Sequence, residues 1–383
     1  MVRRRKKIRS GRVMSVFLLC AIMLLGDAGM MTIQAAPSTG RAANLVVIVR
    51  YQGDTVGDDD TGYNTPYTSQ ISGAPTTYWG LLQRRFNGEN DTFAIGSFRE
   101  YLSRLSGGAH QVESLFPQTV SGERVEYITL DKTLAEYQGS NEISLVAEVA
   151  QKLTEKYPTY DGTLLDRDGD GAIDNLMILA SVPKTGQFTP HTTNAGNSYT
   201  FAGKTIGYYN ILETCTTTLS SGTFWDSFDI ATAAHEYVHT FGVPDYYRTS
   251  GMNGTPVGMW DLMAGSLGRP SLLATTRENI GWTKIAQKTA TSSTYTLYDM
   301  DSAYANGGKS QAYKFYTPFS SSEYFVVEYR RPGKKYSADL DQNMSGAGLI
   351  VYRVNPAYAT DGNLRGNDYI YVFRPDDTGG NAS

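Results

Sequence analysis

The hydrophobic pattern of the chain divides into buried strands and amphipathic helices as far as residue 285. Residues 44–50 (NLVVIVR) and 173–182 (IDNLMILASV) are apolar runs rich in branched side chains, which is typical of strands buried on both faces. Ser97 and Glu100 form a capping-box pair ahead of an apolar stripe that a glycine closes. A second stripe at helical spacing consists of Ile143, Val146, Ala150 and Leu153. This alternation predicts an α/β layout for residues 44–285.

The pattern changes in the last hundred residues. Short Tyr- and Val-rich segments separated by turn residues follow one another at 294–299, 312–316, 323–329 and 348–353. Strand signals at such short spacing predict a β-rich, sandwich-like C-terminal domain over residues 286–383. Another strand-like segment, IYVFR at 370–374, stands almost at the end of the chain. We therefore expect this domain to be truncated in the present sequence.

The N-terminal pattern is that of an export signal. Residues 1–12 carry seven Lys or Arg and no acidic residue, and an apolar run of 13 residues with one polar position follows, from Val13 to Leu25. A membrane-spanning helix needs roughly 20 apolar residues, so this run is short for an anchor and suits a signal peptide. Small residues at Ala35 and Ala36 offer a cleavage point. We predict a signal peptide over residues 1–36 and a secreted protein without stable membrane insertion. An uncleaved signal would instead hold the protein at the cell surface.

Export changes the charge and the cysteine count. The 383 residues carry a formal net charge of −4, but loss of residues 1–36 leaves 27 Lys and Arg against 37 Asp and Glu, a net charge of −10. An acidic chain without a clustered basic surface does not suit general nucleic-acid binding. Cys20 leaves with the signal, so Cys215 has no partner for a disulfide and is expected to be a small buried side chain. Stability must then come from the core, with metals as a further source.

Two of the four histidines lie within residues 229–245, DIATAAHEYVHTFGVPD. His235 and His239 are four residues apart, so on a helix they point the same way and can both reach one Zn²⁺. Glu236 lies between them and is the expected base toward a metal-activated water. The other face of this helix is apolar and is predicted to pack on the core: Ile230, Ala234, Tyr237 and Phe241.

The third zinc ligand is expected directly after this helix. Gly242 can end the helix in the left-handed conformation, and the returning chain then presents Asp245. Two His and one carboxylate with a fourth position open are the ligands of a catalytic zinc site. An alternative within the same class takes a glutamate from a downstream helix, such as Glu278. An alternative from another class is a non-catalytic, calcium-stabilised surface or adhesion module with a relic zinc site, against which the intact Glu236 argues.

Residues 165–176, LDRDGDGAIDNL, form an acidic loop with carboxylates at alternating positions. Oxygen ligands at this spacing around a permissive Gly171 can wrap a structural Ca²⁺, as in the first half of an EF-hand loop. The candidate ligands are Asp166, Asp168, Asp170 and Asp174. Met177 stands where an EF-hand has its bidentate Glu, so this is not a full EF-hand. A solvated Asp-Gly turn is the alternative. Residues 58–60, three aspartates, could bind a second cation but fit a solvated loop better.

The zinc segment resembles a known family. HEYVHTFGVPDYY (235–247) is similar to the extended zinc motif of the immune inhibitor A family of secreted bacterial metallopeptidases, a metzincin-like group with Asp as third ligand. GMWDLMAGS (258–266) is similar to the family's segment ending in the Met-turn, which implies that Met263 lies beneath the zinc. YYNILE (208–213) resembles the strand that precedes the active helix.

The resemblance covers most of residues 44–374. It implies a zincin-like catalytic domain of α+β or α/β class with an active-site helix and a Met-turn, followed by the β-rich domain. It also implies that the acidic loop binds calcium. Family members often carry a propeptide, whereas the first strand here begins soon after the expected cut, so either no propeptide exists or latency is achieved otherwise.

Together these patterns predict a secreted zinc-dependent endopeptidase that acts as a monomer on protein or peptide substrates, with one catalytic Zn²⁺ and structural Ca²⁺. His191 is expected to be a surface histidine in a loop near the cleft, and His110 a structural one. Tyr246 and Tyr247 are close enough in sequence to be candidates for oxyanion stabilisation.

Overall fold

The computed structural model describes most of the chain beyond the predicted signal peptide. The described residues are 36–54, 62–67, 72–89, 96–120, 124–181, 189–214, 216–218, 224–226, 228–248, 254–289, 293–300, 309–333, 340–364 and 366–374. Residues 1–35, the aspartates at 58–60 and both cysteines lie outside these ranges. No helix in the described part combines the length and the apolar character needed to cross a membrane.

A mainly parallel sheet organises the first part of the chain. Its strands lie in the order β2 (His110–Leu115), β1 (Gly40–Arg50), β7 (Leu176–Ser181), β11 (Tyr208–Thr214) and β8 (His191–Asn194), and β5 (Ile128–Thr129) also pairs with β1. All these pairs are parallel except that of β8 with β11. The apolar run at 44–50 thus lies in the central strand β1, and the run predicted at 173–182 contains the central strand β7.

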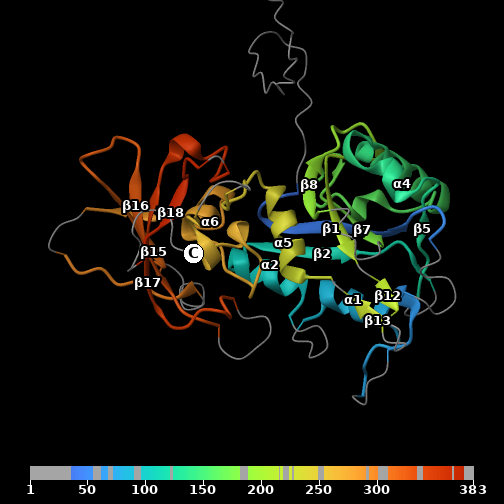
Figure 1. Ribbon diagram of the computed structural model, residues 1–383, viewed down its shortest axis with the longest axis horizontal. Coiled ribbons are helices and arrows are strands. Elements are labelled where there is room, and N and C mark those ends of the chain that lie inside the picture. The colour runs from blue at the N-terminus through green and yellow to red at the C-terminus, as the bar shows by residue number, and fades with distance from the viewer. Residues whose placement is uncertain are drawn as a thin grey trace, which may run out of the picture. The chain divides into compact units, whose positions relative to one another are not determined.

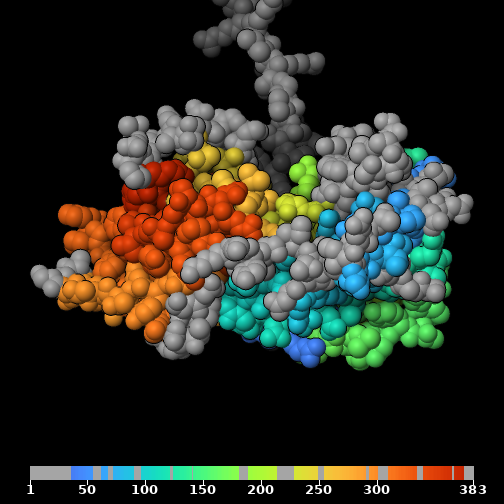
Figure 2. All heavy atoms as spheres, turned by 90° about the horizontal axis from the view of Figure 1, so that it is seen from below, coloured from blue at the N-terminus to red at the C-terminus, as the bar shows by residue number. Residues whose placement is uncertain are grey.

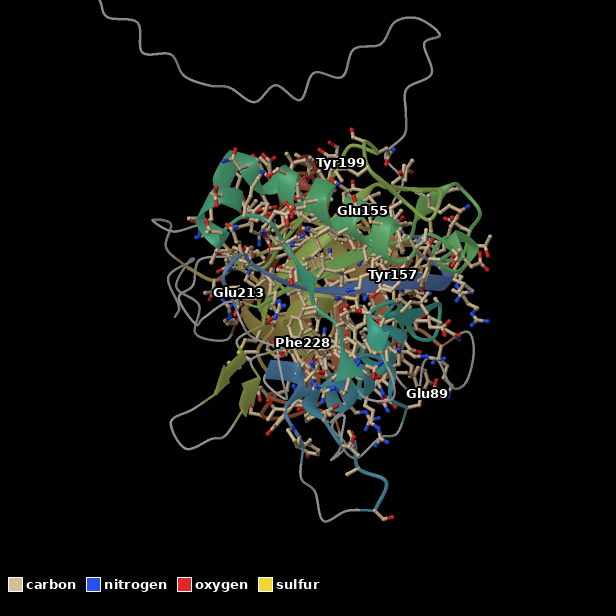
Figure 3. The ribbon with its side chains drawn as sticks, turned by 90° about the vertical axis from the view of Figure 1, so that its right-hand side faces the viewer. Glu89, Glu155, Tyr157, Tyr199, Glu213 and Phe228 are labelled. Carbon is tan, nitrogen blue, oxygen red and sulfur yellow. The ribbon has the colours of Figure 1, made fainter. Side chains whose placement is uncertain are left out.

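Helices cover both faces of this sheet (Figure 1). The helix α4 (Glu142–Lys156) packs on one face, and α1 (Tyr78–Asn87), α2 (Phe98–Ser106) and α5 (Ile230–His239) pack on the other. Figure 3 shows Glu155, on α4, and Phe228, just before α5, on opposite sides of the blue strand β1. Side chains alternate across β1 accordingly, with Val46 in the core under α5 and Val47 in the core under α4.

Local signals explain where the helices begin and end. The Ser97 side chain accepts a hydrogen bond from the Glu100 amide (3.0 Å), the Glu100 carboxylate accepts from the Ser97 amide, and Gly107 ends α2 in the left-handed conformation, φ 63°. The capping box is therefore confirmed. At the start of α5, Asp229 accepts hydrogen bonds from the first-turn amides of the helix.

Short elements complete this part of the chain. The turns of 3₁₀ helix are η1 (Gly62–Asn64), η2 (Gly139–Asn141), η3 (Gly162–Leu164), η4 (Gly258–Trp260) and η5 (Leu262–Ala264), beside the short helix α3 (Leu134–Tyr137). The small strands are β3 (Thr119–Val120), β4 (Arg124–Val125), β6 (Ala172–Ile173), β9 (Thr200–Phe201), β10 (Lys204–Ile206), β12 (Thr216–Thr218) and β13 (Phe224–Asp226).

His110, at the start of β2, is buried among aromatic rings. Its Nε2 lies 3.1 Å from the Tyr237 hydroxyl, and Phe241 and Trp282 flank the imidazole. Burial lowers the pKa of His110 to about 4, so the ring is neutral at physiological pH. This environment is the structural one expected from the sequence.

The C-terminal strands form one sheet in the described residues. Its order is β14 (Ala286–Lys288), β15 (Ala312–Tyr316), β16 (Tyr324–Arg330), β17 (Gly348–Val354) and β18 (Ile370–Val372), with the turn η6 (Pro356–Tyr358) between the last two. The predicted strand at 294–299 is wrong, because 293–299 carry no regular structure. In the described residues this sheet packs on helix α6 (Ala274–Ile280) and not on a second sheet. The predicted sandwich-like arrangement is therefore not found there.

The hydrophobic core continues across the predicted domain boundary. Leu273 and Ala274 of the segment entering α6 share one core cluster with Val326 of β16 and Tyr352 of β17. In Figure 2 the orange and red residues of the C-terminal sheet lie directly against the yellow residues that precede it in the chain. The C-terminal sheet therefore packs on residues 258–285.

Residues of the connection between β17 and β18 also form hydrogen bonds and an ion pair with the segment after α5. The backbone amide of Asn363 donates to the Asp245 carbonyl (3.2 Å), and its side-chain amide donates to the Tyr246 carbonyl (3.1 Å). Arg248 pairs with Asp368 at 2.8 Å. Asn363 is fully buried, so these bonds are shielded from water.

Gly362 is predicted to be intolerant of any side chain. Its φ is +59°, and a Cβ there would overlap the carbonyl oxygen of Asp245. Gly362→Ala should cost roughly 2–4 kcal/mol of stability, a fall in Tm of roughly 5–10 °C in thermal unfolding. Gly346→Ala is the matched control, because a Cβ at Gly346 meets nothing within 4 Å. Equal melting temperatures for the two variants would contradict the contact.

Candidate metal centre and active site

The helix α5 and the turn after it bring the predicted zinc ligands together. His235, His239 and Asp245 each offer a ligand atom, and these atoms lie within 4.8 Å of one another. Gly242 follows the helix with a φ of 76°, and its amide donates to the His239 carbonyl (2.9 Å). The left-handed glycine therefore reverses the chain as predicted, and the reversal places Asp245 beside both imidazoles.

The three donor atoms are closely spaced. The His235 Nε2 lies 3.0 Å from Asp245 Oδ1 and 3.2 Å from His239 Nε2, and His239 Nε2 lies 3.4 Å from the same oxygen. Ligand atoms at 2.0–2.1 Å around a tetrahedral ion are about 3.3 Å apart. The spacing of the three donors thus matches a tetrahedral metal ion.

Backbone carbonyls orient both rings. His235 Nδ1 lies 2.9 Å from the Leu262 carbonyl oxygen, and His239 Nδ1 lies 2.7 Å from that of Val243. Because a carbonyl can only accept, each Nδ1 carries the proton, and each Nε2 of a neutral ring presents a lone pair. Two lone pairs and an anionic oxygen then face one point, an arrangement that suits a cation. This donor set fits zinc.

The pKa values of Asp245 and His235 are both shifted by the groups around them. Burial raises the pKa of Asp245, but the two adjacent histidines lower it by a larger amount, so its pKa lies well below the usual value. Burial lowers the pKa of His235, but the neighbouring carboxylates of Asp245 and Glu236 outweigh this, so the net shift is upward. The carboxylate is therefore anionic and favours positive charge between the donors.

Glu236 is buried beside the two histidines, 5% exposed. Burial raises the pKa of Glu236, and the neighbouring histidines only partly offset this. Its Oε2 lies 3.1 Å from the hydroxyl of Thr192 on β8. A carboxylate with a raised pKa next to a metal centre suits general acid–base chemistry.

The segment around Met263 is hydrogen-bonded to the turn that carries Asp245. The Tyr246 amide donates to the Met263 carbonyl (2.8 Å), and the fully buried Asp261 accepts from the amides of Met263 (2.8 Å) and Leu273 (2.7 Å). Burial raises the pKa of Asp261 to about 6. Met263 itself is fully buried. This turn therefore fixes the backbone on which His235 and Asp245 depend.

The two tyrosines after Asp245 differ in exposure. Tyr246 is fully buried, and its hydroxyl lies 3.4 Å from Thr276, so its candidacy for oxyanion stabilisation is wrong. Tyr247 is 42% exposed, and partial burial together with the nearby Asp245 carboxylate raises the pKa of its hydroxyl. Tyr247 is thus the tyrosine that remains accessible beside the candidate site.

One further sequence expectation changes, and the alternative third ligand is found elsewhere. His191 lies on strand β8 and not in a loop, and its ring bonds Glu142 (2.7 Å) and the Thr189 carbonyl (2.8 Å). Glu278 has both carboxylate oxygens engaged, by the Ile285 amide (2.8 Å) and by Lys314 (2.7 Å). The structure brings Asp245 and not Glu278 to the histidines.

Thr192 is not among the residues predicted from the sequence, yet its hydroxyl contacts both the backbone carbonyl and the carboxylate of Glu236. Thr192 stands in a polar Thr- and Asn-rich stretch without periodicity. No local signal there distinguishes one threonine from its neighbours, because the contact depends on the pairing of β8 with β11.

The acidic loop gathers three of its four predicted ligands. Carboxylate oxygens of Asp166, Asp168 and Asp174 lie within 4.8 Å of one another. The prediction of Asp170 as a ligand is not supported, because its Oδ1 accepts the Ala172 amide (2.8 Å) of the loop itself and it is not part of this group.

The negative charge of these three carboxylates is only partly neutralised by neighbouring groups. Lys204 pairs with Asp166 at 2.6 Å, and the amides of Gly169 and Gly171 donate to the same carboxylate. Burial raises the pKa of Asp174 to about 7, although the Ala43 amide donates to it (2.7 Å). One ammonium group therefore lies among three carboxylates, and the negative charge that it does not neutralise favours the binding of a further cation.

Comparison with known proteins relates part of this chain to a protease. No protein family model matches the chain. The pre-pro-metalloproteases PrtV of two Vibrio cholerae serotype O1 strains, M66-2 and ATCC 39315 / El Tor Inaba N16961, are 28% identical over 226 residues. The match covers 50% of this chain and only 23% of each PrtV.

Solved structures add a weaker likeness. Wild-type OgpA from Akkermansia muciniphila is 11% identical with a TM-score of 0.30, over 85% of this chain and 92% of that one. Catalytically inactive OgpA in complex with an O-glycopeptide substrate is 10% identical with a TM-score of 0.31, over 85% and 91%. Scores this low do not establish a shared fold. The PrtV match supports a relationship to metalloproteases, and the assignment to the immune inhibitor A family stays a prediction.

Proposed function

We propose that this chain is a secreted zinc-dependent endopeptidase of the immune inhibitor A type, with a zincin-like catalytic domain. The observation that carries the proposal is the convergence of His235 Nε2, His239 Nε2 and Asp245 Oδ1 at 3.0–3.4 Å, with Glu236 beside them. The partial similarity to a metalloprotease supports the same class. The predicted export signal supports action outside the cell on protein or peptide substrates.

The residues divide the chemistry among them. His235, His239 and Asp245 would hold the zinc ion, which supplies Lewis acidity toward a peptide carbonyl and a water when bound. Glu236 is placed to accept a proton from the attacking water and to return it to the leaving amine. Its buried position, which raises the pKa of the carboxyl group, suits a group that must both take and give a proton.

Loss of the Glu236 carboxylate should abolish cleavage. Glu236→Gln keeps the shape of the side chain but cannot take up a proton, so we expect casein hydrolysis to fall at least about 100-fold. Treatment with a zinc chelator should have the same effect on the unaltered protein, and added zinc should restore activity. Glu155→Gln, an exposed position on α4, is the matched control and should cleave casein normally.

The same assay separates the rival functions. Cleavage that resists the chelator or survives in Glu236→Gln would contradict the zinc mechanism. A purified protein that binds zinc but cleaves neither casein nor a peptide library would contradict the peptidase proposal. That result would favour the non-catalytic, calcium-stabilised surface module.

We further propose that the acidic loop binds a structural Ca²⁺ through Asp166, Asp168 and Asp174. The support is their mutual proximity and the excess of carboxylate over ammonium charge around Lys204. A cation there would tie the loop to β1, because the Ala43 amide of that strand donates to Asp174.

Calcium should stabilise the protein through this loop. We expect millimolar Ca²⁺ to raise Tm by several degrees, and Asp168→Asn to remove most of this gain because it deletes one ligand charge. Glu155→Gln should keep the full gain. If Tm is indifferent to Ca²⁺, or Asp168→Asn responds like the unaltered protein, Lys204 alone compensates the loop and the calcium proposal fails.

A further inference from the structure

A row of polar side chains crosses the central sheet beneath α5. It comprises one residue at each of five neighbouring strands: Ser114 of β2, Asn44 of β1, Asn175 directly before β7, Asn210 of β11 and Thr192 of β8. Asn44 pairs with Ser114, and Asn210 with Thr192, in the strand register. The first four are buried to 2% exposure or less. The first four lie on the α5 face, since apolar neighbours two residues away, such as Val46, Val112 and Leu212, belong to that core. Thr192 lies on the same face because it pairs directly with Asn210.

The row is one connected set of hydrogen bonds in which donation runs outward from Asn175 toward both ends. The Asn175 side-chain amide donates to Asn44 Oδ1 (2.8 Å) and to Asn210 Oδ1 (2.7 Å). The Asn210 amide donates in turn to Thr192 Oγ1 (3.0 Å). Because Thr192 Oγ1 accepts from Asn210, its own proton must point away from the row. That proton is directed at Glu236.

Glu236 offers the Thr192 hydroxyl two acceptors. Its backbone carbonyl lies 2.5 Å from Thr192 Oγ1, and its carboxylate Oε2 lies 3.1 Å from the same atom. The Asn210 amide also donates to the Glu236 carbonyl (3.1 Å). The carbonyl therefore keeps a donor when the hydroxyl turns to the carboxylate. The edge strand thus holds Glu236 at both its backbone and its side chain.

We infer that Thr192, oriented by Asn210 and Asn175, is a positioning residue that aims the Glu236 carboxylate for proton transfer. The inference rests on the proposed peptidase function. Burial of three amide side chains under a helix is costly, the more so because Asn175 Oδ1 has no hydrogen-bond partner among the described residues. Apolar residues would fill the same space without that cost. We explain the row by the residue at its end: Thr192 contacts the Glu236 carboxylate, which must be held in one orientation for proton transfer.

The test compares Thr192→Val and Thr192→Ser in the full chain, with kcat and KM measured separately on a fluorogenic peptide. Valine keeps the shape of the side chain but removes the hydroxyl, so we expect kcat to fall about 10- to 100-fold with KM within about twofold. Serine keeps the hydroxyl and should restore most of kcat. Thr193→Val is the control, because Thr193 is exposed and its side chain lies on the other face of β8.

Asn210→Leu tests the next residue of the row. If Asn210 acts through Thr192, the double variant with Thr192→Val should lose little more kcat than the worse single variant. A kcat for Thr192→Val equal to that of Thr193→Val, or a Thr192→Ser no better than Thr192→Val, would overturn the inference. In either case the unaltered protein remains active and Glu236→Gln inactive, so the proposed function stands.

A measurement without catalysis keeps the inference testable if the chain proves not to be a peptidase. Thermal unfolding of Thr192→Val, Glu236→Ala and the double variant should give Tm shifts that do not add, because the two side chains contact each other. Shifts that add would show that the hydroxyl and the carboxylate are uncoupled, and would overturn the inference by themselves.

Discussion

The site depends on one electrostatic constraint. Two imidazole lone pairs and a carboxylate oxygen converge at 3.0–3.4 Å, which is unfavourable unless a cation lies among them. The surrounding backbone enforces that convergence, because the carbonyls of Leu262 and Val243 fix which ring nitrogen carries the proton. The binding energy of a metal would then be partly recovered as stability of the segment from α5 to the turn at Met263.

The C-terminal sheet is part of this arrangement. Its region supplies Asn363 and Asp368, which hold the segment that carries Asp245, and its core is continuous with that of α6. On the other side, the edge strand β8 holds Glu236 through Thr192. The candidate metal ligands and the proposed general base are thus held by residues next to the C-terminal sheet and by the edge of the central sheet. Helix α5 links them and buries its apolar face between these supports.

The sequence predicted what depends on local spacing. The capping box of α2, the shared face of His235 and His239, and the reversal at Gly242 all follow from residues close in the chain. The sequence did not reveal contacts that depend on how distant segments pair. Thr192 reaches Glu236 only through strand pairing, and Asp170 turned to its own loop backbone although its spacing suited a ligand. The strand expected at 294–299 did not form because β15, which this segment contacts, already pairs with β14 on one edge and β16 on the other.

The central claim, that His235, His239 and Asp245 together bind zinc, is tested most directly by X-ray absorption at the zinc edge. On zinc-loaded protein the account predicts two imidazole nitrogens and a carboxylate oxygen at about 2.0–2.2 Å. The Asp245→Ala variant should lose the carboxylate oxygen from the spectrum and bind zinc more weakly. Sulfur ligation, or a spectrum and zinc affinity unchanged in Asp245→Ala, would contradict the account.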